Sequence, residues 1–266
     1  MPELPEVEGY RVLAENRALG RRISSVESPD SWYLKRGLDS AGIAAALTGS
    51  RFARARRKGK LLLLDVESSP SGAPHGVLGL HFGMSGRLII DGAASVDRLL
   101  YTAGSDGRHD RFTIRFGDGG WLAVRDPRRL GGVELDADES RLGPDALGLS
   151  ASDLRRALAG SEVAVKARLL DQAKLAGVGN LIADEVLWRA GLAPTRPCRS
   201  LRAADLRRLH RHLSVGLAEL IDRGGSHMGD LEPHRRPGGR CPRDGSPLTR
   251  GTVGGRTTWW CPRHQL

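Results

Sequence analysis

The hydrophobic pattern of this 266-residue chain changes once, at residues 136–150, and this change constrains the fold most. Before it, short apolar runs typical of β-strands lie at 22–26, 60–66, 77–81 and 87–90. RFTIRF-GDGG-WLAVRD indicates a β-hairpin with its turn at 117–120. After it, the periodicity predicts helices at 151–159, 162–172, 181–190 and 203–222. The acidic, turn-rich segment between the two halves reads as a linker.

Both ends of the chain add a small element to these halves. Residues 5–19 place Val7, Tyr10, Leu13 and Ala14 on one helical face, and Gly20 can stop that helix. From residue 223 the chain is rich in Gly, Pro and Arg and ends in a candidate hairpin. We predict an α+β fold with an N-terminal domain at 1–135, a linker at 136–150, a helical domain at 151–223 and a hairpin at 224–266.

The charge indicates a polyanionic partner. The formal net charge is +10 and the pI about 10.3, which favours nucleic acid first and an anionic membrane second. No apolar run is long enough to span a bilayer. Three cysteines without a secretory signal favour a reducing compartment, so we expect a cytoplasmic protein whose Cys198 is a structural thiol. Of 41 basic residues only five are lysine, so a lysine that remains is more often required as an amine.

The first residues, MPELPEVE, are only partly explained by helix formation. Pro5 and Glu6 suit a first helical turn, because proline fits there and acids favour the positive end of the helix dipole. Pro2 and Glu3 precede that turn and need another explanation.

The C-terminal hairpin carries a candidate metal site. Cys241 and Asp244 are separated by two residues, as are Cys261 and His264, and two such pairs on facing turns can supply four tetrahedral ligands to zinc. Asp244 is the unusual ligand, and His227 or His234 could replace it. A segment this small has little hydrophobic core and needs a metal or a cross-link for stability, so we expect one structural Zn²⁺. Arg256 lies at the hairpin tip, where it can contact a phosphate, and the following tryptophans suit hairpin packing.

The sequence KLAGVGN (174–180) connects two amphipathic helices. Its glycines permit unusual backbone conformations, and Asn180 suits the N-cap of the next helix. Exposed amides at a helix start bind anions, so in this basic chain we expect phosphate binding here rather than an ordinary helical hairpin.

These segments, in this order, resemble the formamidopyrimidine-DNA glycosylase and endonuclease VIII family of base-excision repair. The resemblance rests on MPELPEVE, HFGMSGRL, DPRRLGG, LLDQAKLAGVGNLIADEVLWRAGLAP and the spacing of the tail, and it covers nearly the whole chain. It implies an N-terminal β-sandwich with an N-terminal helix, a helix–two-turns–helix domain and a zinc-finger hairpin. It also implies a monomeric DNA glycosylase with lyase activity on damaged double-stranded DNA.

The resemblance gives the N-terminus a chemical role. Initiator methionine is normally removed before proline, which would leave Pro2 as a secondary amine with a pKa of roughly 7.7–8.0. This amine would attack the sugar C1′, form an iminium ion and permit β,δ-elimination. Glu3 would act as general acid/base, which as a neutral acid needs a raised pKa. Glu6 would position the terminus or be a first-turn acid only, and Lys60, rather than Lys58, would bind the phosphate beside the lesion.

The resemblance also assigns DNA contacts. Met84 would fill the gap left by the flipped nucleotide, and Arg128 and Leu130 would support the opposite strand. Asn180 and Arg256 would hold the flanking phosphates. Lys166 would assist them or be a solvated helix residue.

The sequence departs from the family at three points. Leu130 stands where many relatives have phenylalanine, which leaves the opposite-base preference open. The segment at 224–240 is short, which favours oxidised pyrimidines or abasic sites over 8-oxoguanine. Asp244 and His264 replace two cysteines. The alternative functions are a non-catalytic DNA-damage binder, which an intact Pro2 disfavours, and a zinc hydrolase, which a closed ligand set disfavours.

Overall fold

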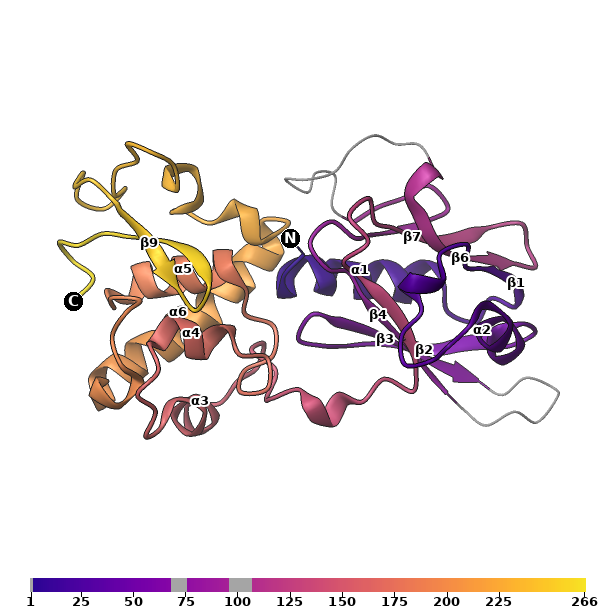
Figure 1. Ribbon diagram of the computed structural model, residues 1–266, viewed down its shortest axis with the longest axis horizontal. Coiled ribbons are helices and arrows are strands. Elements are labelled where there is room, and N and C mark those ends of the chain that lie inside the picture. Colours follow the sequence, from indigo (N-terminus) through magenta and orange to yellow (C-terminus); the bar gives the residue numbers. More distant parts are fainter. Residues whose placement is uncertain (1, 68–75, 96–106) are drawn as a thin grey trace. The chain divides into compact units, whose positions relative to one another are not determined.

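The computed structural model describes residues 2–67, 76–95 and 107–266, so the state of Met1 lies outside the described residues (Figure 1). The chain forms two compact units, one of residues 1–2 and 6–139, the other of residues 3–5 and 140–266. No described helix is both long and apolar enough to cross a bilayer.

The first unit contains two four-stranded antiparallel sheets. In spatial order, one consists of β1 (Ile23–Glu27), β6 (Asp110–Phe116), β7 (Trp121–Arg125) and β5 (Arg87–Ile90). The other consists of β2 (Arg51–Lys58), β3 (Leu61–Glu67), β4 (Val77–His81) and β8 (Gly132–Leu135). Short 3-10 segments lie at Ser31–Tyr33, Gly107–His109 and Glu139–Arg141.

The two sheets share one hydrophobic core. The side chains that fill it come from both sheets, including Phe112, Leu122, Leu62, Leu64 and Leu80, all fully buried. The helix α1 (Leu4–Arg17) adds Val7, Tyr10 and Ala14 to the same core. The predicted sandwich with an N-terminal helix is therefore confirmed, and so is the hairpin formed by β6 and β7.

Two elements of this unit, β2 and a short helix, were not predicted from the hydrophobic pattern of the sequence. The strand β2 carries five basic residues in eight and buries only Phe52 and Ala55, because its order comes from pairing with β3 along its length. The helix α2 (Ser40–Leu47) is short, and Asp39 caps it by accepting a hydrogen bond from the Gly42 amide at 2.7 Å.

The second unit is helical and carries the predicted hairpin. Its helices are α3 (Ala151–Leu158), α4 (Val165–Leu170), α5 (Asn180–Ala190) and α6 (Ala203–Asp222), and its hairpin pairs β9 (Thr249–Val253) with β10 (Arg256–Trp260). Short 3-10 segments lie at Cys198–Ser200, Ser226–Met228 and Glu232–His234. In Figure 1 the hairpin overlaps α5, and the strand that contacts this helix is β10, whose Trp259 amide donates to Asp184 of α5 at 3.2 Å. The four helices share a second core, which also buries Ala146 and Leu149 from the segment interpreted as a linker.

The helix α4 is shorter than predicted. The preceding residues pair with another backbone segment, since the Cys198 amide donates to the Val163 carbonyl at 3.0 Å. The Val165 amide donates to the Arg196 carbonyl at 2.8 Å. Residues 162–164 therefore use their backbone groups outside the helix, which begins only at Val165.

The sandwich core predicts a large difference between two similar truncations. Leu64→Ala removes a fully buried side chain from β3 and should lower the free energy of unfolding by about 2–5 kcal/mol. Val12→Ala removes a side chain of α1 that is 40% exposed, and should change it by less than about 0.5 kcal/mol. Urea denaturation of both variants measures the difference, and equal effects would contradict this description of the core.

Candidate active site and metal centre

The carboxylate of Glu3 lies at the amino end of α5. Glu3 is fully buried, and its two oxygens accept hydrogen bonds from the amides of Leu181 at 2.9 Å and Ile182 at 3.1 Å. The next residue continues this contact, because the Leu4 amide donates to the Gly177 carbonyl at 3.3 Å. Amides at a helix start attract anions, and two such donors stabilise the ionised form of a carboxylate.

This contact corrects two sequence-based expectations about residues 174–180. The first amides of α5 are not exposed for a phosphate, because the Glu3 carboxylate occupies them. The N-cap is Gly179, and Asn180 is the first residue of the helix. The Asn180 side chain points to the hairpin instead, where its amide donates to the Thr257 carbonyl at 3.0 Å.

The sequence AGVGN is shaped to admit Glu3. Gly179 has an extended backbone that any residue can adopt, but a Cβ there would lie 2.1 Å from the Glu3 carboxyl carbon. Gly177 has a φ of +110°. Gln172, which sequence reasoning missed, holds the turn by accepting from the Gly177 amide at 3.0 Å and donating to the Val178 carbonyl at 2.9 Å.

The other expected catalytic residues lie in the first unit. Pro2 and Glu6 are both buried. Burial, and then the charge of Glu6, raise the pKa of the Tyr10 hydroxyl one helical turn away. Lys60 lies in the two-residue turn between β2 and β3, directly before the leucine strand. The ammonium of its competitor, Lys58, donates to the Glu139 carbonyl at 3.1 Å.

His81 is a candidate that sequence reasoning missed. It ends β4 and pairs with Leu61, the residue after Lys60. The side chain is exposed at the surface, yet the packing around its ring and then the Lys60 ammonium lower its pKa. The sequence could have indicated this candidate, because His81 stands at the end of a predicted strand and three residues before Met84.

Met84, Arg128 and Leu130 lie on two loops that contact each other. A Cβ on Gly83, whose φ is +57°, would lie 2.4 Å from the Leu130 carbonyl carbon. Arg128 and Leu130 are exposed, and Leu130 is 49% accessible. The structure therefore brings these three predicted residues to adjoining loops.

A single buried carboxylate connects these loops. The Ser85 hydroxyl donates to Asp126 at 2.5 Å, and the Gly131 amide donates to its other oxygen at 2.8 Å. The Arg128 amide also lies 3.2 Å from this carboxylate. Asp126 is fully buried, and sequence reasoning missed its role because its partners are 41 residues apart from it or within its own loop.

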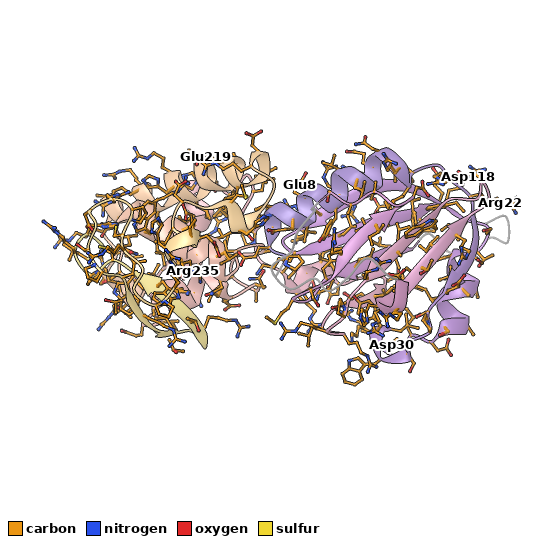
Figure 2. All side chains as sticks on the ribbon, turned by 90° about the horizontal axis from the view of Figure 1, so that it is seen from above. Glu8, Arg22, Asp30, Asp118, Glu219 and Arg235 are labelled. Atoms are coloured by element: carbon orange, nitrogen blue, oxygen red, sulfur yellow. The ribbon has the colours of Figure 1, made fainter. Side chains whose placement is uncertain are left out.

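Lys166 is not the solvated residue that the sequence left open. Its ammonium is fully buried, 2.7 Å from the Asp184 carboxylate of α5 and 2.7 Å from the Thr258 hydroxyl of β10. Burial lowers the pKa of Lys166, and Asp184 opposes that effect. Arg235, labelled in Figure 2, lies 2.9 Å from the same carboxylate. This position does not support a direct phosphate contact by Lys166, which instead joins α4 and α5 to the hairpin.

The four predicted metal ligands form one cluster. The donor atoms of Cys241, Asp244, Cys261 and His264 all lie within 4.8 Å of one another, so the group can hold a metal ion. His227 and His234 are described in the structure but are not in this group, so neither replaces Asp244. Ser246 fixes Asp244, because its amide donates to that carboxylate at 2.9 Å and lowers the pKa.

The spacing within the cluster fits a tetrahedral ion. A tetrahedron has edges about 1.6 times its bond length, so bonds of roughly 2.0–2.3 Å give edges of about 3.3–3.8 Å. The Cys241 sulfur lies 3.7 Å from His264 Nδ1, and an Asp244 oxygen lies 3.3 Å from both that nitrogen and the Cys261 sulfur. Two sulfurs, a nitrogen and an oxygen at these distances suit a divalent ion of zinc's size.

Trp188 of α5 supports two of the ligands. Its indole N–H donates to the Cys241 sulfur at 3.3 Å, and its carbonyl lies 3.2 Å from His264 Nε2. A proton on Nε2 leaves the Nδ1 lone pair for the metal, as outer hydrogen bonds to metal-bound histidines do. Arg256 begins β10 as an exposed residue, after Gly254 and Gly255 with positive φ.

Sequence comparisons decide the family. The profile of the formamidopyrimidine-DNA glycosylase N-terminal domain matches residues 1–133, and that of the H2TH domain matches residues 142–231. A formamidopyrimidine-DNA glycosylase of Cereibacter sphaeroides is 36% identical, with 100% of both chains covered. One of Arabidopsis thaliana is 32% identical over 100% of this chain and 71% of its own.

The chain belongs to the formamidopyrimidine-DNA glycosylase family. Members of this family are DNA glycosylases with AP lyase activity, so the chain is an enzyme of base-excision repair. Among solved structures, Fpg of Lactococcus lactis in complex with a THF-DNA and an inhibitor has a TM-score of 0.82, 27% identity and full coverage of both chains. A complex of the same protein with DNA containing an abasic site is equally similar, with 99% coverage.

The contact between Glu3 and α5 predicts a coupled pair of variants in this glycosylase. Gly179→Ala should expel the Glu3 carboxylate from the helix start and lower the free energy of unfolding by about 1–3 kcal/mol, since two amide donors lose a buried partner. In a Glu3→Ala background the same substitution should have little effect. Thermal denaturation of the four proteins measures the coupling.

Gly216→Ala is the matched control for this cycle. A Cβ at Gly216 in α6 would meet only ordinary contacts, the nearest at 3.7 Å, and alanine favours a helix. We expect unchanged or higher stability. Equal destabilisation by Gly179→Ala with and without Glu3 would contradict the described contact.

Proposed function

We propose that this protein excises oxidised bases from duplex DNA and then cleaves the strand, using the amine of Pro2 as its nucleophile. The observation that supports this most is the fixed position of Glu3, the residue bonded to Pro2. Two backbone amides hold that carboxylate, so the chain terminus begins at a rigid point.

The secondary amine of Pro2 suits the first step. With a pKa of roughly 7.7–8.0 for an α-amino group, a useful fraction is neutral near pH 7.5. Its nitrogen forms a bond to the sugar C1′ while the bond from C1′ to the base breaks and the base leaves with a proton. Ring opening then gives an iminium ion that accepts electrons, which permits β-elimination and then δ-elimination of the two phosphates.

Glu3 is proposed as the general acid/base of these steps. Its two amide donors favour the carboxylate form, which can accept a proton and pass it to the opened sugar. Glu6 is proposed to position the terminus from the next turn of α1. Lys60, with His81 across the strand pair, is proposed to bind the phosphate beside the lesion.

The proposed DNA contacts use residues from both units. Met84 is proposed to fill the space of the flipped nucleotide, and Arg128 and Leu130 to support the opposite strand, on loops that Asp126 fixes. Asn180 and Arg256 are proposed to hold flanking phosphates. One chain carries this complete set, so we propose that the protein acts as a monomer.

For the substrate we propose oxidised pyrimidines and abasic sites ahead of 8-oxoguanine. The segment at 224–240 is short, and part of it is packed on α5. Glu185 accepts from the amides of Asp230 at 3.1 Å and Leu231 at 2.8 Å, and Leu231 is fully buried. These contacts leave little chain to cover a flipped purine. The Lactococcus lactis protein has been solved with DNA containing an oxidised pyrimidine and with N7-benzyl-Fapy-dG DNA.

The metal is proposed to be one structural Zn²⁺. The four ligands leave no open coordination position, so the ion would fix the turns beside β9 and β10 and thereby Arg256. No chemical step is assigned to it.

The nucleophile is tested by trapping the covalent intermediate. Incubation with abasic-site DNA and borohydride should give one protein–DNA adduct, and Pro2→Gly should reduce it on the order of 100-fold or more. Pro29→Gly, at an exposed proline, is the matched control and should trap normally. Peptide mass spectrometry should locate the DNA remnant on Pro2, and trapping that Pro2→Gly leaves unchanged would refute this mechanism.

The metal proposal is tested by two cysteine substitutions. We expect elemental analysis to find one zinc per chain in the parent and none in Cys261→Ser, which should also bind lesion DNA about tenfold more weakly through loss of one charge-assisted phosphate contact. Cys198→Ser changes a buried cysteine outside the cluster and should retain the metal. Full zinc occupancy in Cys261→Ser would show that the cluster is not the site.

A further inference from the structure

The second unit contains a basic pocket that the proposed chemistry does not use. The cavity has a volume of about 750 Å³. Its walls come from the carboxyl end of α5, the first three turns of α6 and the turns that carry the metal ligands. Asp205 is the only acidic side chain among its thirteen lining residues. Six of the thirteen are arginines: Arg189, Arg196, Arg202, Arg208, Arg211 and Arg243.

Three of these arginines have acidic partners within the protein. Arg189 lies 2.6 Å from Glu185 and 2.5 Å from Glu219, which Figure 2 labels on the second unit. Arg196 and Arg208 share Asp205, at 2.9 and 2.8 Å. These pairs hold three of the arginine side chains in the walls of the pocket.

The other three arginines have no acidic partner among the residues that the structure describes. Arg202 is exposed at the start of α6, and Arg211 is exposed two turns later, 3.3 Å from the His212 ring. Arg243 donates to the Arg189 carbonyl at 3.3 Å and lies over the Trp188 ring, with 5.1 Å between the guanidinium carbon and the ring centroid. These guanidinium groups leave an unbalanced positive charge at the pocket.

A neighbouring side chain responds to this charge. Partial burial and then the charges of Arg211, Arg189 and Arg243 lower the pKa of His212. After burial, these arginine charges are the next cause that opposes protonation of the imidazole, so the potential at the pocket disfavours another cation. An anion would be attracted by the same potential.

The pocket lies at the opposite end of α5 from Asn180, which is proposed to hold a phosphate of lesion DNA. Asn180 begins α5, whereas Arg189 and Ala190, which line the pocket, end it. Eleven helical residues span roughly 16 Å. A phosphate in the pocket would therefore be a different one from the phosphate that Asn180 is proposed to hold.

We propose that this pocket is a second phosphate-binding site, which takes a compact run of phosphate groups. Guanidinium groups bind phosphate oxygens in pairs of parallel hydrogen bonds, and three arginines without acidic partners suit a ligand with several such oxygens. The phosphates can come from a second DNA segment or from a free polyphosphate such as a nucleotide. This proposal goes beyond the base-excision chemistry and does not depend on Pro2.

The first experiment measures binding of tripolyphosphate to the full-length, metal-loaded protein by calorimetry. We expect one site per chain, with Arg202→Gln/Arg211→Gln at least about tenfold weaker, because two charge-assisted contacts are lost. Both positions are exposed, so the protein should remain folded. Arg243 is left unchanged because it neighbours the metal ligand Asp244.

A matched control distinguishes binding in the pocket from nonspecific attraction to the positive charge of the protein. Arg155→Gln/Arg207→Gln removes the same two charges from exposed helical positions outside the pocket and should bind tripolyphosphate like the parent. Equal weakening in both double variants would overturn the proposal. So would tighter binding of a poly-glutamate peptide than of tripolyphosphate, because it would make the ligand a carboxylate partner.

The source of the phosphate is distinguished on the complex with a short lesion duplex. If the complex binds a labelled undamaged duplex, and Arg202→Gln/Arg211→Gln loses it, the site takes a second DNA segment. If it binds tripolyphosphate but no second duplex, the site takes free polyphosphates. Binding of neither, or binding that the pocket variant retains, overturns the proposal. Pro2→Gly should bind tripolyphosphate as the parent does, so failure of the excision mechanism would not affect this test.

Discussion

The buried carboxylate of Glu3 at the start of α5 is the contact on which the rest of the site depends. A helix start presents unsatisfied amides, and here a carboxylate from 178 positions earlier in the sequence satisfies two of them. Burying a carboxylate without such donors costs several kcal/mol. The Glu3 side chain is therefore restricted to the one place in the second unit where these amides can bind it. The need for glycine at 177 and 179 follows from it, because a Cβ at either position would overlap Leu4 or Glu3. It also limits Pro2, which is one peptide bond from a fixed residue.

The second constraint is the buried pair of Lys166 and Asp184. A buried ion pair contributes little net stability, but removing one partner costs about 3–5 kcal/mol. Both groups therefore belong together, and their remaining hydrogen bonds go to β10 and to Arg235. The hairpin is thus held to α5 from two sides, by this pair and by Trp188 at the metal ligands. A hairpin without a large core of its own is positioned by such polar contacts, and the cluster of candidate metal ligands lies at its base.

The sequence predicts what depends on neighbours along the chain and fails where partners are distant. The β6–β7 hairpin, the bounds of α6 and the four-residue metal cluster follow from spacing, since each element carries its own periodicity or ligand pattern. The Glu3 contact joins residues 178 positions apart, so the amides of α5 looked free in the sequence. The strand β2 was not predicted, because it has no apolar run of its own and the neighbouring leucine strand supplies its order. Asp126 looked like part of a motif, and only its fold shows that it holds two loops.

Net charge also proves a poor guide to binding unless the partners of each cation are known. In this arginine-rich chain, much of the positive charge is used internally, as Arg189 shows by contacting Glu185, Glu219 and Asp230. Arg56 likewise joins Asp65 and Glu139 within the first unit. Such arginines support the fold and contribute little attraction at a distance, because their fields are cancelled within a few ångströms. An anion is attracted by the positive charge that has no acidic partner. A concave surface that brings several such arginines together concentrates this charge in one place. A basic surface is therefore better described by its uncompensated guanidinium groups than by the pI of the chain.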